Sequence, residues 1–191
     1  MKLTTLTDML DLASKNETYA FSNKMLGSYF PAESKQNLKK TIERAITTGV
    51  LTRACRGVYL YPKGNVNNSY TLESIALALR SGGYSYISLE TALSECSIIS
   101  QMTISHLTVM TTGRSQTYAT PHGVVELTHT SRTEKDIIEN TYKQNQRPLR
   151  IAKPALALSD LKRVNRNLHM VDMAVFNDIL KDTRNEKNIA L

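Results

Sequence analysis

Residues 34–64 have the sequence SKQNLKKTIERAITTGVLTRACRGVYLYPKG. The first part predicts a basic helix that ends at Thr47 or Thr48, because its apolar residues recur at helical spacing and Gly49 stands where a left-handed C-cap is common. The following residues predict a short β-hairpin, with strands over 50–53 and 57–61. A basic helix followed directly by a hairpin is typical of a winged helix-turn-helix.

Two further helices are expected before this stretch. Leucines at helical spacing predict the first over about residues 3–13. The second runs from Lys24 to about Tyr29, where Ser22 or Asn23 supplies the N-cap and Pro31 stops the helix. Residues 1–65 are therefore predicted to be a winged helix-turn-helix DNA-binding domain.

Opposite its apolar stripe, the third helix has a basic and polar face. Amide side chains can hydrogen-bond base edges, and lysines can pair with bases or phosphates. Arginines beside a hairpin turn suit phosphate or minor-groove contact. The candidate DNA-binding residues are Lys24, Ser34, Lys35, Gln36, Asn37, Lys39, Lys40, Arg44, Arg53 and Arg56. Of these, Ser34, Lys35 and Gln36 are the best candidates for sequence readout, although the same helix also fits a solvated basic face without a partner.

The charge of the chain is unevenly distributed. The net charge is +7, and residues 1–65 carry ten Lys or Arg against five Asp or Glu, whereas residues 66–191 carry fourteen against twelve. A local basic excess is the footprint expected for contact with a polyanion.

Residues 66–191 predict an α+β domain, so the whole chain is expected to be an α+β protein. A helix begins at Thr71, a strand covers 104–111, and a hairpin pairs 116–119 with 124–129. Helices are expected over 154–164 and 171–180, and the polar residues 182–191 are expected to be frayed.

Sequence signals for an enzyme, a metal site or a membrane span are lacking. The chain contains no P-loop, GxGxxG or GxSxG motif, so we expect neither catalysis nor a cofactor. The four histidines are scattered, Glu126 reads as a surface charge, and Cys55 and Cys96 lack metal-ligand spacing, so no metal is expected. No apolar run approaches eighteen residues and the N-terminus does not resemble a signal peptide, which favours a cytoplasmic protein without membrane contact.

Four segments together resemble the AbiEi family of antitoxins. GVLTRACRGVYLYP at 49–62 is similar to the wing of that family, and ISLETAL at 87–93 is similar to its Ser-x-x-(S/T)-Ala-Leu helix. Residues 103–112 resemble its following strand, and IAKPALALSD at 151–160 resembles its Ala-x-Pro-x-x-Ala-x-x-Asp segment. In order and spacing, the resemblance covers nearly the whole chain.

The resemblance implies a transcriptional autorepressor and antitoxin in a bacterial phage-defence operon. Such a protein binds inverted or direct repeats in its own promoter, and its C-terminal domain counteracts a nucleotidyltransferase-like toxin. A second basic cluster would then be a surface for DNA or toxin, or simply a helix-capping effect, and it comprises Lys162, Arg163 and Arg166. The alternative function is a protein-interaction module that neutralises its partner by direct complex formation, with DNA binding secondary.

Overall fold

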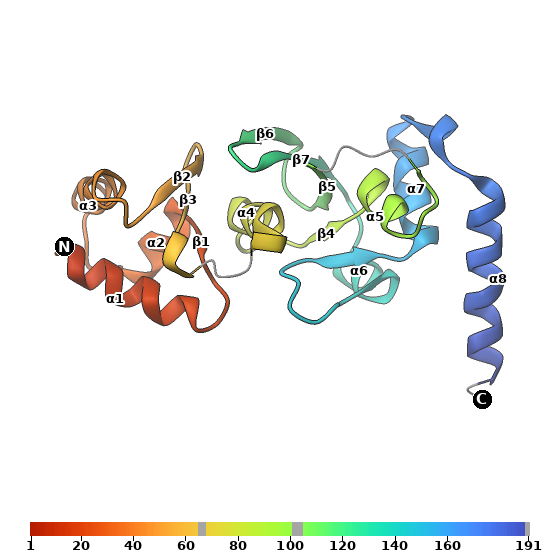
Figure 1. The fold of residues 1–191 in the computed structure, drawn as a ribbon, viewed down its shortest axis with the longest axis horizontal. Helices are drawn as coiled ribbons and strands as arrows, with labels where there is room; N and C mark the ends of the chain where they lie inside the picture. Colours follow the sequence, from red (N-terminus) through yellow and green to blue (C-terminus); the bar gives the residue numbers. More distant parts are fainter. Residues whose placement is uncertain (65–67, 101–104, 190–191) are drawn as a thin grey trace. The chain divides into compact units, whose positions relative to one another are not determined.

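The computed structural model describes residues 1–64, 68–100 and 105–189 of a mixed α+β protein. The chain forms two compact units (Figure 1), of which the first comprises Met1–Gly83 with Tyr118–Val125 and the second comprises Tyr84–Thr117 with Glu126–Leu191. The expected domain boundary at residues 65 and 66 lies outside the described residues. Helix α4 (Thr71–Leu79), which follows that boundary, packs on strands of the first unit and belongs to it.

The first unit begins with helices and ends its sheet with a hairpin. The α-helices and strands that precede α4 are α1 (Leu3–Ser14), β1 (Ala20–Ser22), α2 (Asn23–Tyr29), α3 (Lys35–Thr47), β2 (Thr52–Cys55) and β3 (Val58–Leu60). The three expected helices and the hairpin are confirmed. Strand β1 was not expected from the sequence, yet it pairs antiparallel with β3 and gives a three-stranded sheet of order β1-β3-β2.

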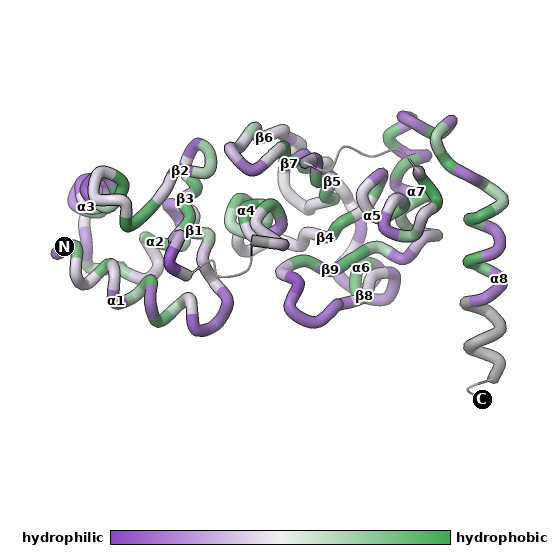
Figure 2. The backbone as a smooth tube through the Cα atoms, in the orientation of Figure 1, coloured by the Kyte–Doolittle hydropathy of each residue, from purple (hydrophilic) through white to green (hydrophobic). Residues whose placement is uncertain are grey.

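Helix α3 is fixed at both ends and along one side. The Ser34 hydroxyl accepts a hydrogen bond from the Asn37 N–H at 3.2 Å, so Ser34 is the N-cap. After the helix, Gly49 adopts a φ of 73°, as the sequence predicts. The buried side chains recur at the helical period and comprise Leu38, Thr41, Ile42 and Ala45. Figure 2 shows both hydrophilic and hydrophobic colours in α3.

The first strand of the hairpin lies two residues later than predicted, and the second is one residue shorter at each end. Its turn is Arg56-Gly57, flanked by the Cys55–Val58 pair, because Gly57 adopts a φ of 79° and so decides where the chain reverses. The pairing shifts register between Arg53 and Cys55. The Gly57 carbonyl also accepts a hydrogen bond from the Asn23 N–H at 3.0 Å, which ties the hairpin tip to the start of α2.

A mixed sheet lies mainly in the second unit, with residues 118–125, part of one of its hairpins, counted in the first, and the described residues of the second unit also contain four α-helices. Its strands are β4 (Ser85–Ile87), β5 (His106–Thr111), β6 (Gln116–Thr120), β7 (Gly123–His129), β8 (Thr141–Tyr142) and β9 (Arg150–Ala152). The sheet order is β6-β7-β5-β4-β9-β8, and β4 pairs parallel with β9. The helices are α5 (Leu89–Glu95), α6 (Glu134–Asn140), α7 (Pro154–Val164) and α8 (Met173–Ile189).

Most sequence expectations for the second unit are confirmed. The β6–β7 hairpin and helix α7 lie where predicted, whereas β8 and β9 were not expected. Residues 182–189, which were expected to be frayed, belong to α8, which continues to Ile189. The first residues of the predicted strand 104–111, like those of the family-like segment 103–112, lie outside the described residues. Within the described ranges, no helix is long and apolar enough to cross a membrane.

Candidate nucleic-acid interface

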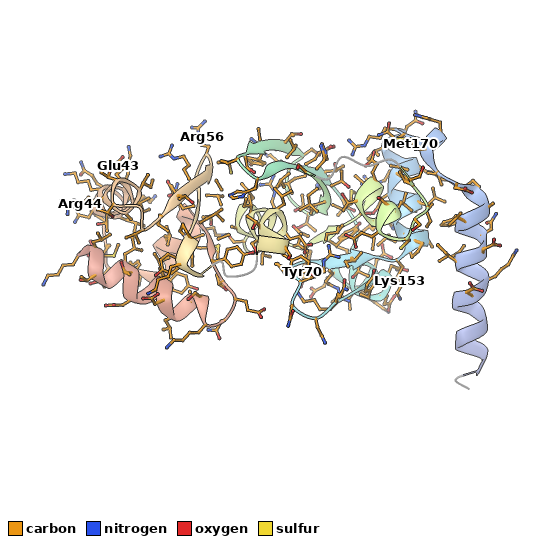
Figure 3. All side chains as sticks on the ribbon, in the orientation of Figure 1. Glu43, Arg44, Arg56, Tyr70, Lys153 and Met170 are labelled. Atoms are coloured by element: carbon orange, nitrogen blue, oxygen red, sulfur yellow. The ribbon has the colours of Figure 1, made fainter. Side chains whose placement is uncertain are left out.

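The solvent-facing side of α3 lies opposite its buried stripe. Gln36, Lys40, Glu43 and Thr47 follow one another four, three and four residues apart, which places them on one face, and all four are exposed. Lys39 and Arg44 flank this row and are also exposed. Figure 3 shows Glu43 and Arg44 pointing away from the body of the first unit.

Apart from Thr47, whose hydroxyl donates to the Glu43 carbonyl at 3.0 Å, the polar side chains of this face make almost no bonds within the molecule. Lys39 Nζ lies 3.9 Å from Glu43 Oε1, which is an ion pair but not a hydrogen bond. Across the described part of the chain, the structure shows no hydrogen bond that engages the side chains of Lys35, Gln36, Asn37, Lys40 or Arg44. Their donors and acceptors are exposed and have no partner among the described residues, so they are available to a ligand.

Most arginines of the second unit, in contrast, are used internally. Arg147 makes a bidentate ion pair with Glu95, with distances of 2.8 and 3.0 Å. Arg150 and Arg163 donate to backbone carbonyls at 3.0 Å and 2.8 Å. Because these guanidinium groups already have partners, the uncommitted positive charge of the described chain is greatest on α3.

The remaining predicted residues of the first unit occupy different positions. Arg56 is exposed at the tip of the β2–β3 hairpin, as Figure 3 shows. The Arg53 guanidinium lies over the ring of Tyr59, 5.9 Å from its centroid, in a cation–π contact. Lys24 Nζ donates to the Ser81 carbonyl at 3.3 Å. Ser34 caps α3, so its hydroxyl has a structural partner before any ligand arrives.

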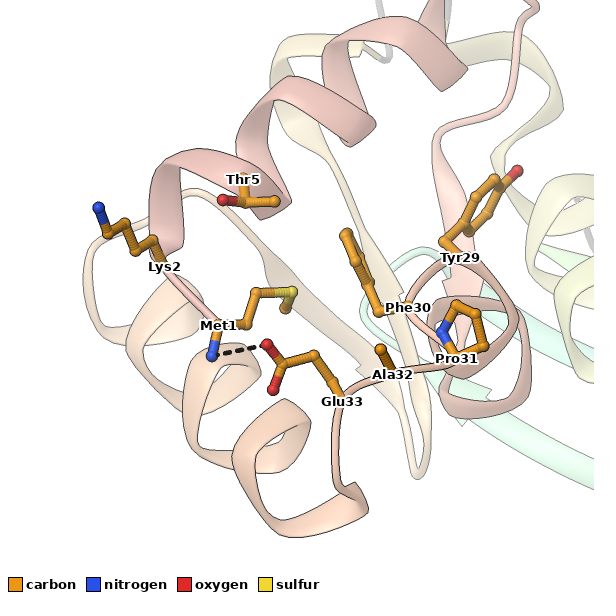
Figure 4. Close-up of a pocket in the computed structure, with 8 residues that line it drawn as sticks. All are labelled: Met1, Lys2, Thr5, Tyr29, Phe30, Pro31, Ala32 and Glu33. Atoms are coloured by element: carbon orange, nitrogen blue, oxygen red, sulfur yellow. Dashed lines mark ion pairs between the residues drawn. The ribbon is translucent and has the colours of Figure 1, made fainter.

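The start of α3 is held next to the start of α1. The Met1 ammonium lies 3.0 Å from Glu33 Oε1, and the Thr41 hydroxyl donates to the Met1 carbonyl at 3.2 Å. Figure 4 shows the open groove beside these contacts, which has a volume of about 640 Å³ and is lined partly by Tyr29 and Phe30. These contacts fix the N-terminal half of α3 and leave its outer face uncovered.

The predicted second basic cluster is not a continuous cationic surface. Arg166 makes a bidentate ion pair with Glu90, at 2.9 Å for both bonds, and also donates to Glu126. Lys162 is exposed, and Arg163 donates to the His129 carbonyl. The three residues diverge because Arg166 follows the left-handed cap of α7 at Asn165, which turns the chain away from the helix axis.

Glu126 is not the isolated surface charge that the sequence indicates. Its second oxygen lies 3.1 Å from His106 Nε2, on the neighbouring strand β5. Burial raises the pKa of the Glu126 carboxyl, but hydrogen bonds from Arg166 and His106 outweigh burial and lower that pKa below its ordinary value of 4.5. The cluster is an internal ion-pair network of the second unit.

A second internal network centres on Asp160, whose side chain is fully buried in α7. Its carboxylate accepts hydrogen bonds from Tyr86 Oη and Ser88 Oγ, both at 2.9 Å, and from Arg132 at 3.1 and 3.2 Å. Burial and the neighbouring carboxylate of Asp160 raise the pKa of the Tyr86 hydroxyl well above its ordinary value, so Tyr86 remains a donor. An acid within the largely apolar run 155–161 is the sequence signal that could have indicated this network.

Neither network offers a site for metal chemistry. The described residues contain no group of three His, Cys, Asp or Glu side chains that could hold a metal ion. No model of a known protein family matches the sequence, and no curated protein matches it either. Function is therefore inferred from the geometry, and the free polar face of α3 is the strongest candidate site.

Proposed function

We propose that the first unit is a winged helix-turn-helix that binds double-stranded DNA through α3. The observation that carries this proposal is the exposed face of α3, where four cations and two amides lack hydrogen-bonding partners among the described residues. The order of elements supports it, since α1, β1, α2, α3 and a hairpin occur in the sequence of a winged helix, with the sheet order β1-β3-β2.

In this proposal α3 enters the major groove and the hairpin reaches the neighbouring backbone. The major groove is about 12 Å wide and admits one α-helix. Gln36 and Asn37 at the start of α3 hydrogen-bond base edges, while Lys39, Lys40 and Arg44 contact phosphates on either side. Arg56, at the hairpin tip, contacts a phosphate or the minor groove.

The resemblance to the AbiEi antitoxins extends the proposal to a biological role. The first unit binds repeats in the promoter of its own operon and represses transcription, and the second unit counteracts a nucleotidyltransferase-like toxin. The protein acts in the cytoplasm by binding rather than by catalysis. The two internal networks around Asp160 and Glu126 support a structural task for their charged residues, because their side chains are satisfied by one another.

A binding titration of the full chain tests the proposal. The duplex immediately upstream of this gene is compared with a scrambled duplex of the same composition, at two salt concentrations. The proposal predicts tighter, salt-sensitive binding to the upstream duplex, and Arg53→Ala/Arg56→Ala weakens it on both duplexes. Equal affinity for the two duplexes would refute sequence-specific repression and would favour a protein partner for this face.

A further inference from the structure

Glu43 stands at the centre of the exposed face of α3, among cations. Gln36 and Lys40 precede it on the same row and Thr47 follows it. A carboxylate in this position is unfavourable for general phosphate binding, because it repels the same backbone that the lysines attract. The charge therefore has to be explained by something other than non-specific affinity.

The carboxylate of Glu43 is not committed to a structural partner. Its side chain is 56% exposed, and its nearest cation, Lys39 Nζ, is 3.9 Å away. An exposed pair of this kind contributes little to stability, and Lys before Glu is the weaker order for an i, i+4 pair. Glu43 also borders a shallow hollow of about 320 Å³ that is lined by Lys40, Arg44, Thr47 and Thr48.

We infer that Glu43 reads a cytosine in the major groove, an assignment that rests on the DNA-binding function proposed above. Cytosine presents a 4-amino donor there, whereas guanine presents two acceptors and thymine an acceptor and a methyl group. A carboxylate accepts from cytosine and is repelled by guanine and thymine. Adenine offers its 6-amino group, but its adjacent N7 acceptor makes it the poorer partner for a carboxylate.

The distance along α3 between Gln36 and Glu43 predicts how far apart on the DNA the bases that they contact should be. Seven residues separate Gln36 from Glu43, and at 1.5 Å per residue this is a rise of about 10 Å along α3. With bases 3.4 Å apart, that rise corresponds to about three base pairs. Gln36 favours adenine, so the site should contain an adenine and, about three base pairs away, a cytosine.

Selection of binding sites from a randomised duplex pool, by the full-length protein, tests the inference. The variant is Glu43→Gln, and the matched control is Asp8→Asn, which removes one exposed carboxylate from α1 of the same unit. The wild type and Asp8→Asn should select the same cytosine. Glu43→Gln should lose the preference for cytosine over adenine at that position by roughly ten-fold, while binding the random pool at least as tightly.

The outcomes separate the two levels of the argument. If the wild type selects a defined sequence and Glu43→Gln selects the same one with the same cytosine, the role of Glu43 is refuted while DNA recognition stands. If the wild type selects no sequence at all, the proposed function fails and this inference fails with it. Equal melting temperatures of the three proteins confirm that the comparison is made between folded proteins.

Discussion

Removing two cations from α3 should change how strongly DNA binding depends on salt. Lys40 and Arg44 are exposed and make no side-chain hydrogen bond within the described residues, so replacing both with glutamine leaves the fold intact, to within about 0.5 kcal/mol for each substitution. Each cation that neutralises a phosphate contributes about −0.9 to the slope of log affinity against log salt. The variant is therefore a measure of phosphate contact rather than of stability.

The magnitude follows from the number of cations on the proposed surface. The wild type has six candidate cations, which are Lys35, Lys39, Lys40, Arg44, Arg53 and Arg56. If all six neutralise a phosphate, the slope is about −5.4, and in the double variant it becomes less steep, at about −3.6. Doubling the salt concentration should then weaken the wild type about 40-fold and the double variant only about 12-fold.

Fluorescence anisotropy with a labelled duplex at four or more salt concentrations measures both slopes. Lys162→Gln is the matched control, since this lysine is exposed in the second unit and carries the same charge. Its slope should equal that of the wild type. A double variant with the wild-type slope, or a Lys162→Gln slope that changes equally, would show that α3 does not meet the phosphates.

Three further predictions concern stability. Asp160→Ala leaves its buried donors unpaired and should lower the free energy of unfolding by about 3 kcal/mol, measured by urea denaturation. Gly57→Ala forces alanine to a φ of 79° and should cost about 1–2 kcal/mol, whereas Gly27→Ala, inside α2 and with room for the added methyl, should be neutral or stabilising. The pKa of Glu126 is lowered on folding, so its contribution to the free energy of unfolding is complete above pH 4.5 and is lost as the pH falls further. Glu126→Gln should therefore weaken the dependence of the free energy of unfolding on pH below 4.5.

The elements that were predicted correctly depend on neighbours in the sequence. The limits of α3 follow from the Ser34 cap and Gly49, both local signals. The exposed row on α3 follows from the same periodicity, so the exposure of the candidate residues on this helix could be predicted from the sequence. The sequence does not show that Lys24 and Arg53 are engaged within the molecule, because their contacts with Ser81 and Tyr59 depend on how strands and helices pack.

The features that were missed depend on contacts between distant segments. Strand β1 has three residues, and only its pairing with β3, nearly forty residues later in the chain, defines it. Arg166 was grouped with Lys162 and Arg163 by sequence, but its partners Glu90 and Glu126 lie on α5 and β7. Such ion pairs are set by the sheet order of the second unit, which periodicity alone does not contain.

Lysine protection in the protein–DNA complex tests most directly whether α3 is the surface that meets the duplex. The full chain is acetylated briefly with and without saturating upstream duplex, and the modified lysines are quantified by mass spectrometry. Lys35, Lys39 and Lys40 should lose reactivity in the complex, while the exposed Lys15 and Lys162 should retain it. Protection of Lys162 with unchanged reactivity of the three α3 lysines would contradict the account.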